Sequence, residues 1–392
     1  MLNYPFKILY IHQDGDYTGS FMSMMNMIEG FEDGKVRPVI LFLKNGPAVQ
    51  GAQAKGIETI VHHGKTFWTA PGPKWNQRGT LNNMKALIPD FKLRKIIKTV
   101  SPNLIHINDK AAINAGISSI GLKIPIIQHL RSSYYTCNFF LHKWISICCI
   151  KLYSNLCIAI SEDEASDFNS KKTKVVFNSI SMDAIGNAIS SKITIENNRV
   201  NIGWIGRFTY GKGAWDFLDI ANNLNKLFPN SLHFHMLAPL PTEDDYDLIN
   251  QLVVKTKEYL NQKINDYHLA EHITLHGYRK DFLSVAASMD IMINCNRLGE
   301  MGRQAFECAC LGIPTIVTVK HPGRSSVLNN QVAFVCKEGD INNITSCAEK
   351  LVKDPLLRSD FSVKAYDWGT GQFNARKQSK KVYEIYSRLI IS

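Results

Sequence analysis

The sequence predicts an α/β protein built from two doubly wound, Rossmann-like domains. Three observations support this fold class. The chain has 392 residues, which is enough for about two domains. Short apolar runs of strand length alternate with segments of helical spacing, which is typical of βαβ units and a mostly parallel sheet. The alternation stops in a polar stretch at about 179–199 and then starts again.

The first series forms an N-terminal domain, which we place at 1–183. A turn after its first strand leads into a Met-rich helix at about 21–31, and apolar residues recur at helical spacing from 82 to 100. The apolar runs that we interpret as strands are 7–12, 36–43, 58–63, 103–108, 124–130 and 156–161.

The second series forms a C-terminal domain, which we place at 184–372. It opens with a strand at 200–206 and a helix at 214–228. Residues 373–392 are rich in Lys and Arg and have the pattern of a final amphipathic helix, which we assign to the N-terminal domain. The further strands of the second series are predicted at 232–238, 272–277, 291–296, 315–319 and 332–336.

The composition excludes a disordered or fibrous protein, because 45% of the residues are hydrophobic and 20% are charged. The net charge of +11 is uneven: residues 1–180 hold 21 Lys and Arg against 12 Asp and Glu, a net of +9, which leaves +2 for the remainder. The chain shows no helix-turn-helix, zinc-finger, RRM or KH pattern, so we expect no nucleic-acid partner.

The basic N-terminal half predicts an anionic partner, either a membrane surface or a lipid pyrophosphate. The alternative is that its helices are core helices with solvated polar faces, and for the helix at 84–100 this alternative is the better interpretation. Contact with a membrane interface is predicted most clearly for 138–153, where apolar and basic residues alternate: Phe139, Phe140, Lys143, Trp144, Ile147 and Lys151.

Other sequence features concern the compartment. Nine cysteines are scattered without CxxC pairs, which favours a reducing cytosol. The first residues lack the apolar core and cleavage site of a signal peptide. The most apolar stretch, 139–150, is too short to span a membrane and contains His142 and Lys143. We therefore expect a cytoplasmic protein that binds peripherally to the inner face of the membrane.

The first candidate site is the segment 203–213. A buried strand ends at Gly206, and Arg207 and Lys212 then flank a short loop that opens a helix. Two cations beside a helix N-terminus suit a diphosphate, because backbone amides and side chains both favour the anion. The spacing fits neither a GxGxxG fingerprint nor a Walker P-loop. The alternative is an ordinary βα turn with surface cations.

The second candidate site is the segment 296–317. A strand ends near Asn294, a loop holds Glu300 and Gly302, and a helix carries Glu307. A carboxylate near the start of such a helix can accept hydrogen bonds from the vicinal hydroxyls of a ribose. The alternative is a solvated helix glutamate, which the positive end of the helix stabilises by about 0.3–1 kcal/mol.

Together, these segments resemble the family-4 retaining glycosyltransferases of the GT-B fold, the glycosyl transferases group 1. That family has a strand followed by Gly-Arg and then Lys-Gly, matched here by Gly206-Arg207 and Lys212-Gly213. Its later helix is matched in register by Gly302, Glu307, Gly312 and Pro314. Further segments that resemble the family, in the same order, are 18–19, 102–108, 124–131, 158–161, 175–181 and 272–281.

Two positions depart from the family pattern. The family's first glutamate stands eight positions before the second, where this chain has Gly299, and Glu300 follows one residue later. Glu300 reaches the family's sugar contact only if the loop adjusts. Ser326 stands where a further family glutamate is common.

The resemblance implies two domains facing across a cleft, with the C-terminal helix crossing back to the N-terminal domain. It implies transfer of a sugar from a nucleotide diphosphate sugar with retained anomeric configuration. Arg207 and Lys212 would stabilise the leaving diphosphate, helped by amides near Gly19 and Gly302. The other donor-binding residues that it implies are Glu307 at the ribose, Tyr278 at the base, Arg303, and Glu300 at the sugar. No metal or other cofactor is required.

On the N-terminal domain, the resemblance places His129 and Arg131 beside the transferred sugar or the acceptor, with His129 as a third catalytic candidate. Without the resemblance, the better interpretation of His129 is a histidine at the end of a strand whose ring nitrogens form hydrogen bonds within the protein. The implied acceptor is a glycan or a polyprenyl-diphosphate-linked sugar in the synthesis of a cell-surface polysaccharide such as lipopolysaccharide or capsule. The alternatives are another reaction in the same fold, such as a phosphorylase or epimerase, and a non-catalytic protein that binds nucleotide sugars or acts as a scaffold.

Overall fold

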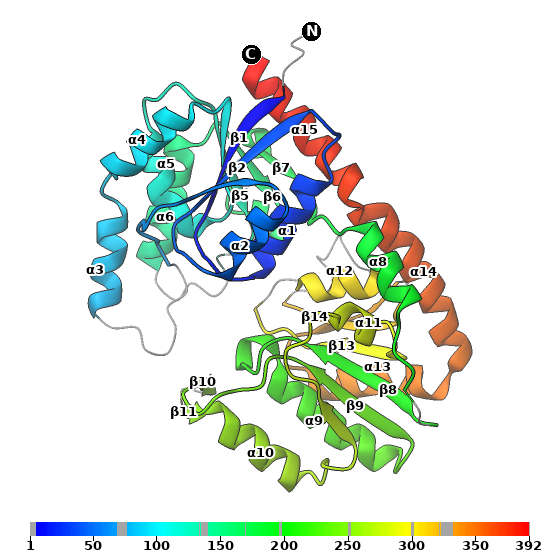
Figure 1. Ribbon diagram of the computed structural model, residues 1–392. Coiled ribbons are helices and arrows are strands. Elements are labelled where there is room, and N and C mark those ends of the chain that lie inside the picture. The colour runs from blue at the N-terminus through cyan, green and yellow to red at the C-terminus, as the bar shows by residue number, and fades with distance from the viewer. Residues whose placement is uncertain are drawn as a thin grey trace. The chain divides into compact units, whose positions relative to one another are not determined.

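A computed structural model of the chain describes residues 5–68, 77–132, 134, 140–168, 170–195, 198–249, 252–298, 302–320, 322 and 332–391. The chain divides into two compact units. Unit 1 combines Met1–Ser181 with Asn374–Ser392, and unit 2 is Met182–Phe373. Each unit is a parallel sheet with helices on both faces, which confirms the predicted fold class (Figure 1).

Within its described residues, unit 1 has a seven-stranded parallel sheet of order β3-β2-β1-β4-β5-β6-β7. The order reverses between β1 and β4, which is where a doubly wound sheet binds ligands beyond its carboxyl edge. The strands are β1 (Phe6–His12), β2 (Val36–Phe42), β3 (Glu58–Val61), β4 (Leu104–Ile107), β5 (Ile126–Leu130), β6 (Leu156–Ala159) and β7 (Thr173–Val175).

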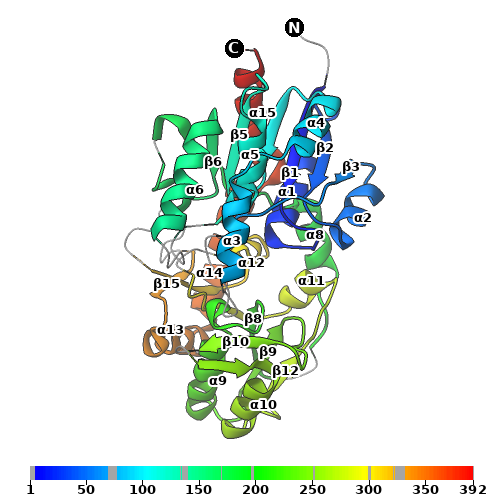
Figure 2. The same cartoon turned by 90° about the vertical axis from the view of Figure 1, so that its left-hand side faces the viewer.

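Helices cover both faces of this sheet. Successive side chains of β1 point to opposite faces, and both sets are apolar and buried. Leu9 and Ile11 pack with α4, α5 and α6 on one face, and Ile8 and Tyr10 pack with α1, α2 and α15 on the other. Figure 2 views unit 1 from the first of these faces. The helices of unit 1 are α1 (Gly19–Glu29), α2 (Pro47–Ala54), α3 (Gln77–Ala86), α4 (Phe91–Val100), η1 (Lys110–Ala112), α5 (Ile113–Ser119), α6 (Phe140–Tyr153), α7 (Glu162–Ala165), η2 (Ser170–Lys172) and α15 (Ala375–Ile391).

The C-terminal helix α15 belongs to unit 1, as predicted for the closing helix. It packs against α1, and in Figure 1 it runs in red beside the blue elements of the N-terminus. Its Val382 and Tyr386 are buried in the core of unit 1. The helix follows a break at Asn374, which pairs with Ile180 as an isolated bridge.

Unit 2 has a six-stranded parallel sheet of order β12-β9-β8-β13-β14-β15 among its described residues, and it reverses between β8 and β13. A separate antiparallel hairpin, β10–β11, follows β9. The strands are β8 (Val200–Ile205), β9 (Leu232–Leu237), β10 (Tyr246–Ile249), β11 (Leu252–Lys255), β12 (Ile273–Leu275), β13 (Ile291–Asn294), β14 (Thr315–Val319) and β15 (Phe334–Lys337).

The core of unit 2 also has two sides. Trp204 and Phe234 pack with α9, α10 and α13, and Val317 packs with α12 and α14 on the other face. The helices of unit 2 are α8 (Met182–Ser190), η3 (Tyr210–Lys212), α9 (Ala214–Leu227), α10 (Thr256–Asp266), α11 (Phe282–Ala286), α12 (Arg303–Cys310), α13 (Ile341–Lys353) and α14 (Pro355–Phe373).

One predicted helix is divided in the structure. The apolar spacing from 82 to 100 covers α3 and α4, which are separated around Pro89 because proline disfavours helical backbone in the residue before it. Asp90 then caps α4 by accepting the amides of Lys92 and Leu93 at 2.9 and 3.0 Å. Within the described residues, no helix is both long and apolar enough to cross a membrane.

Candidate active site

The loops that follow β8 and β13 meet at the point where the sheet of unit 2 reverses its order. Residues 206–213, which we call the Lys212 loop, follow β8, and residues 295–298 follow β13. The backbone N–H of Arg297 donates to the carbonyl of Gly211 at 3.0 Å, and the Cβ that would be added at Gly211 lies 3.0 Å from Leu298. The structure therefore brings the two predicted donor segments together at one sheet edge.

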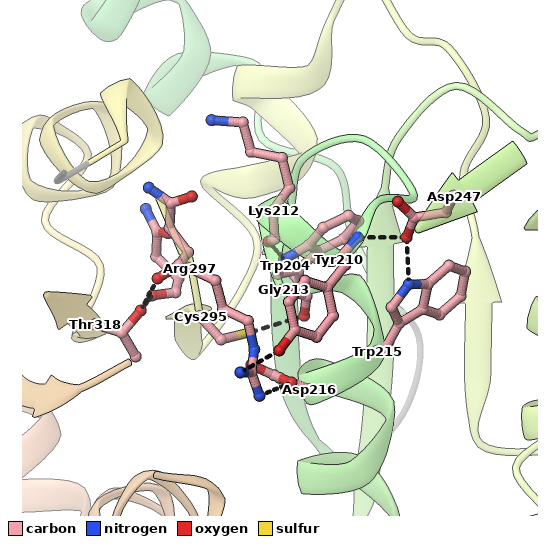
Figure 3. Close-up of polar contacts among 12 residues, drawn as sticks. Trp204, Tyr210, Lys212, Gly213, Trp215, Asp216, Asp247, Cys295, Arg297 and Thr318 are labelled. Atoms are coloured by element: carbon pink, nitrogen blue, oxygen red, sulfur yellow. Dashed lines mark hydrogen bonds and ion pairs between the residues drawn. The ribbon is translucent and has the colours of Figure 1, made fainter. Parts of the chain in front are cut away.

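Gly213 ends the Lys212 loop and allows it to lie against β13. Its φ is +71°, a left-handed conformation that glycine adopts without strain. A Cβ on Gly213 would lie 1.9 Å from the carbonyl oxygen of Cys295, so no side chain fits here. The thiol of Cys295 in turn donates to the carbonyl of Gly213 at 3.2 Å (Figure 3). Glycine is therefore required both for the backbone conformation and for the close contact.

Arg297 holds the loop from the opposite side. Its guanidinium donates to both carboxylate oxygens of Asp216, at 2.6 and 2.8 Å, and to the hydroxyl of Tyr210 at 2.8 Å. The guanidinium also stacks over the Tyr210 ring, 4.6 Å from its centroid. Burial opposes the charge of Arg297, but the hydrogen bonds and the negative charge of Asp216, with smaller contributions from Tyr210 and Cys295, together raise the pKa of Arg297 above its usual value. Arg297 is thus committed to fixing the Lys212 loop.

Asp247 on the β10–β11 hairpin is a third support. Its Oδ2 accepts the backbone N–H of Tyr210 at 2.5 Å and the indole N–H of Trp215 at 2.7 Å (Figure 3). The acidic run that contains it is exposed at 242–246, but Asp247 itself is buried. The two hydrogen bonds, from residues on η3 and α9, compensate the burial of the Asp247 carboxylate.

The side chain of Lys212 points away from this network of supporting residues in Figure 3. The backbone carbonyl of Lys212 accepts the indole N–H of the fully buried Trp204 at 3.1 Å, so the core of unit 2 fixes the backbone of Lys212. Arg207 follows β8 after Gly206 and is exposed. Both predicted cations therefore lie at the carboxyl edge of the sheet, in a loop whose shape is set by other residues.

The N-terminus of α12 is the second predicted feature of this edge. Gly302 is its N-cap residue and supplies no side-chain cap to the first-turn amides. Arg303, the first residue of α12, donates through Nε to Oε1 of Glu307 at 2.7 Å. Glu307 lies one helical turn later and is buried. Glu300, Gly299 and Ser326 lie outside the described residues.

The remaining predicted donor residue, Tyr278, follows β12 and is 68% exposed. Its neighbour Arg279 is paired with Asp281 at 2.6 and 2.9 Å. An exposed phenol ring at the end of a strand on this edge is available to a flat ligand. No group of three or more His, Cys, Asp or Glu residues that could hold a metal ion occurs in the described part of the chain.

Unit 1 carries the predicted acceptor-side residues at its own carboxyl edge. Nε of Arg131 donates to Asn108 at 2.5 Å and Nη1 donates to Asn178 at 2.8 Å, while Asn108 also bonds Nδ1 of His12 at 3.0 Å. Arg131 is buried and connects the loops that follow β4, β5 and β7. Gly19 is the first residue of α1, and the space where its Cβ would project is open for 4 Å.

His129 ends a buried hydrogen-bond relay that begins on the C-terminal helix. Tyr386 donates its hydroxyl hydrogen to the hydroxyl of Tyr10 at 3.2 Å, so its oxygen accepts from Nδ1 of His106 at 2.6 Å. Nε2 of His106 is then an acceptor for the Nδ1–H of His129, 3.0 Å away. We infer from this order of donation that His129 carries its proton on Nδ1.

The second ring nitrogen of His129, Nε2, lies outside the relay. This nitrogen is buried and has no hydrogen-bond partner among the described residues. Burial, the charge of Arg131 and the neighbouring His106 all hold the pKa of His129 well below its usual value. The imidazole is therefore neutral near pH 7, and its unpartnered Nε2 lone pair suits a ligand hydroxyl as donor.

Sequence reasoning did not identify the supporting residues Asp216, Asp247 and Arg297, or the relay partners His106 and Tyr386. Arg297 follows a predicted strand, which was the one available signal. The relay pair is separated by 280 positions in the chain and has no local pattern. The roles predicted for Arg207, Lys212, His129 and the other site residues stay predictions.

Comparison with known proteins identifies the family. Residues 187–368 match the model of the glycosyl transferases group 1. The chain carries a group 1 glycosyltransferase domain. A curated relative, the capsular polysaccharide biosynthesis glycosyltransferase CapM of Staphylococcus aureus, is 24% identical over 162 residues. That match covers 41% of this chain and 39% of the relative.

Solved structures agree in fold over nearly the whole chain. HepE of Anabaena in complex with UDP has a TM-score of 0.76 at 17% identity, covering 97% of this chain and 100% of that one. A glycosyltransferase from Rickettsia africae has a TM-score of 0.72 at 16% identity, covering 98% and 99% of the two chains. These likenesses place the group 1 domain in a two-unit GT-B fold.

The relay predicts that Tyr386 sets the tautomer of His129. In Tyr386→Phe, His106 loses the acceptor for its Nδ1–H, so we expect both histidines to become mixtures of the Nδ1–H and Nε2–H forms. Nitrogen-15 NMR of histidine-labelled protein measures this. In the unaltered chain His129 should show the Nδ1–H form and not titrate between about pH 8 and pH 6.

The matched control is Tyr383→Phe, because Tyr383 lies on the same helix but stacks on Phe6 outside the relay. It should leave both tautomers unchanged. An Nε2–H form of His129 in the unaltered protein, or an unchanged spectrum in Tyr386→Phe, would contradict the relay.

Proposed function

We propose that this chain is a retaining glycosyltransferase that transfers a hexose or related sugar from a nucleotide diphosphate sugar to an acceptor hydroxyl. The observation that carries the proposal is the Lys212 loop, which is held from three sides with its cation projecting away from the supports. The group 1 family match of the same unit supports it. The HepE structures in complex with UDP and with UDP-glucose support a uridine nucleotide as donor.

In the proposed reaction, the bond between the anomeric carbon and the diphosphate oxygen breaks, and the acceptor oxygen bonds the same face of the sugar. The acceptor's proton passes to the departing phosphate oxygen. Negative charge grows on the diphosphate, so Lys212, Arg207 and the uncapped amides of α12 stabilise the transition state. Because the loop is already fixed, little reorganisation is needed as the charge develops. We propose that the protein's own cations suffice and that no metal is used.

The remaining roles follow from position and chemistry. Glu307 would accept ribose hydroxyls with the oxygen that Arg303 does not occupy at 2.7 Å. Tyr278 would flank the base with its exposed ring. His129 would accept a hydroxyl of the transferred sugar or the acceptor at Nε2, while Arg131 holds the surrounding loops. Gly19 would let the first amides of α1 approach an anionic group.

We place the acceptor on unit 1 and propose a glycan or a polyprenyl-diphosphate-linked sugar, used in building a cell-surface polysaccharide. The net charge of +9 in residues 1–180 supports an anionic acceptor or surface. The capsular role printed for the S. aureus relative is in keeping with this.

We further propose that unit 1 binds an anionic membrane surface peripherally. Four apolar side chains of α3, α4 and their connection are 54–77% exposed: Leu81, Met84, Ile88 and Phe91, which we call the α3–α4 patch. Four exposed lysines share these two helices: Lys85, Lys92, Lys95 and Lys98. We expected this region to be a core helix with a solvated polar face, and only its inner side, with Leu93 and Ile97 buried, packs that way.

The helix α6 supports the same proposal. Phe140, Leu141 and Trp144 are 80%, 61% and 56% exposed, beside Lys143 and Lys151. Exposed apolar side chains interspersed with lysines suit an interface with anionic lipid, where each cation adds about 1 kcal/mol. Phe139 lies outside the described residues.

The diphosphate assignment is tested by Lys212→Ala. Loss of one preorganised donor at the developing charge should lower turnover of UDP-sugar about 10²- to 10³-fold. Release of UDP measures it. The matched control is Lys226→Ala, an exposed lysine in the last turn of α9, which should leave turnover unchanged.

Unchanged turnover in Lys212→Ala would exclude the assigned role of the loop. Thermal stabilisation by UDP without hydrolysis or transfer of any nucleotide sugar would favour the alternative of a non-catalytic binding protein.

The membrane surface is tested by Ile88→Ser/Phe91→Ser. Sedimentation with phosphatidylglycerol vesicles should show at least tenfold weaker binding, because burial of each large apolar side chain is worth about 1.5–3 kcal/mol. The control is Leu356→Ser, which removes a side chain 82% exposed on unit 2 and should bind as before. Absence of binding by the unaltered chain at low salt, or equal binding by the double variant, would contradict the proposal.

A further inference from the structure

A pocket of about 300 Å³ lies in unit 1 between the loop that follows β3 and the helix α3. No residue assigned to the donor or to His129 contributes to it. Its lining is polar, basic and aromatic, and contains no acidic side chain: Gly64, Lys65, Thr66, Trp68, Asn82, Asn83 and Lys85.

The backbone of Trp68 is rigidly held although its ring is exposed. The buried Asn83 accepts the backbone N–H of Trp68 at 2.9 Å and donates to its carbonyl at 2.8 Å. The preceding Phe67 is buried in the core, and the indole N–H of Trp68 donates to Thr66 at 2.9 Å. The side chain of Trp68 is nevertheless 40% exposed. An aromatic ring that is partly exposed on a fixed backbone can stack against a flat apolar surface, such as one face of a sugar.

Three cations surround this ring. Lys65 and Lys85 line the pocket, and Nζ of Lys44 lies 5.8 Å from the centroid of the Trp68 ring. None of these three lysines forms an ion pair with another described residue of the chain. Within the described part of the chain no ion pair compensates their charges, and together they favour an anionic ligand.

The pocket lies at the same edge of the sheet as His129 and Arg131. Lys44 follows β2 and Lys65 follows β3, and the carboxyl ends of parallel strands share one edge. Two hydrogen bonds link the loop of the pocket to the segment that holds Arg131. The N–H of Phe67 donates to the carbonyl of Ala111 at 2.8 Å, and Nζ of the adjacent Lys110 donates to the carbonyl of Ser132 at 2.9 Å, next to Arg131.

We propose that this pocket binds a sugar unit that carries an anionic group, a carboxylate or a phosphate ester, with the ring against Trp68 and the anion between Lys65 and Lys85. The assignment of that sugar to the acceptor rests on the proposed function, whereas the binding itself does not. The chain would thus select an acidic acceptor glycan through a subsite on unit 1.

Calorimetry with trigalacturonic acid, with glucose 6-phosphate and with neutral maltotriose tests the subsite without any donor. At low salt, at least one of the two anionic probes should bind at least tenfold more tightly than maltotriose, with an affinity that falls as salt is added. Trp68→Ala and Lys65→Ala/Lys85→Ala should each weaken this binding at least tenfold, and Trp68→Tyr should retain most of it.

Two controls keep the result specific. Trp144→Ala removes another exposed tryptophan of unit 1, and Lys98→Ala removes another exposed lysine, and neither should change binding. Because Trp68 is held through its backbone, its variants should fold, which unchanged thermal unfolding would verify. These measurements do not depend on Lys212, so the subsite and the transferase proposal succeed or fail separately.

Three outcomes would overturn the proposal: equal binding of maltotriose and the anionic probes, failure of both anionic probes to bind, or unchanged binding in Trp68→Ala. Farnesyl diphosphate serves as a lipid-borne anion. If it alone binds and depends on Lys65 and Lys85, the pocket recognises a lipid pyrophosphate and the assignment to an acidic sugar is wrong.

Discussion

The close contact between Gly213 and the carbonyl of Cys295 is the constraint on which the geometry of the unit 2 site depends. It allows the loop after β8 to lie against the loop after β13, at the one place where the strand order reverses. A side chain here would meet the carbonyl at 1.9 Å and would also force a left-handed residue at a cost of about 1–2 kcal/mol. Arg297 and Asp247 hold the Lys212 loop through separate contacts with Asp216, Tyr210 and Trp215.

Two cations at this site have different positions. One fixes the loop and the other projects from it. Arg297 is bound on two sides by Asp216, which is buried, and by Tyr210. The side chain of Lys212 projects from the same loop and points away from Asp216 and Tyr210 in Figure 3. The protein thus uses Arg297 to fix the loop, while Lys212 projects from it. Unit 1 divides the roles in the same way, since Arg131 fixes loops while Nε2 of His129 has no hydrogen-bond partner among the residues that the structure describes.

Regular elements were predictable because their signal is local. The buried strands read as apolar runs, so β1, β8 and β14 were found within a residue or two of their ends. The division of one helix into α3 and α4 required attention to Pro89. The buried Asp247 could not be found, because its acidic neighbours are exposed and its partners Tyr210 and Trp215 are more than thirty positions away. The relay from Tyr386 to His129 depends on tertiary packing between the two ends of the chain and has no sequence pattern.

The central claim is that the Lys212 loop and the first turn of α12 bind the diphosphate of the donor. A crystal structure of the chain with UDP tests it most directly. We expect phosphate oxygens within hydrogen-bonding distance of Nζ of Lys212 and of the first amides of α12, with the ribose hydroxyls at Glu307. A diphosphate bound elsewhere, or a Lys212 side chain turned away from it, would contradict the account.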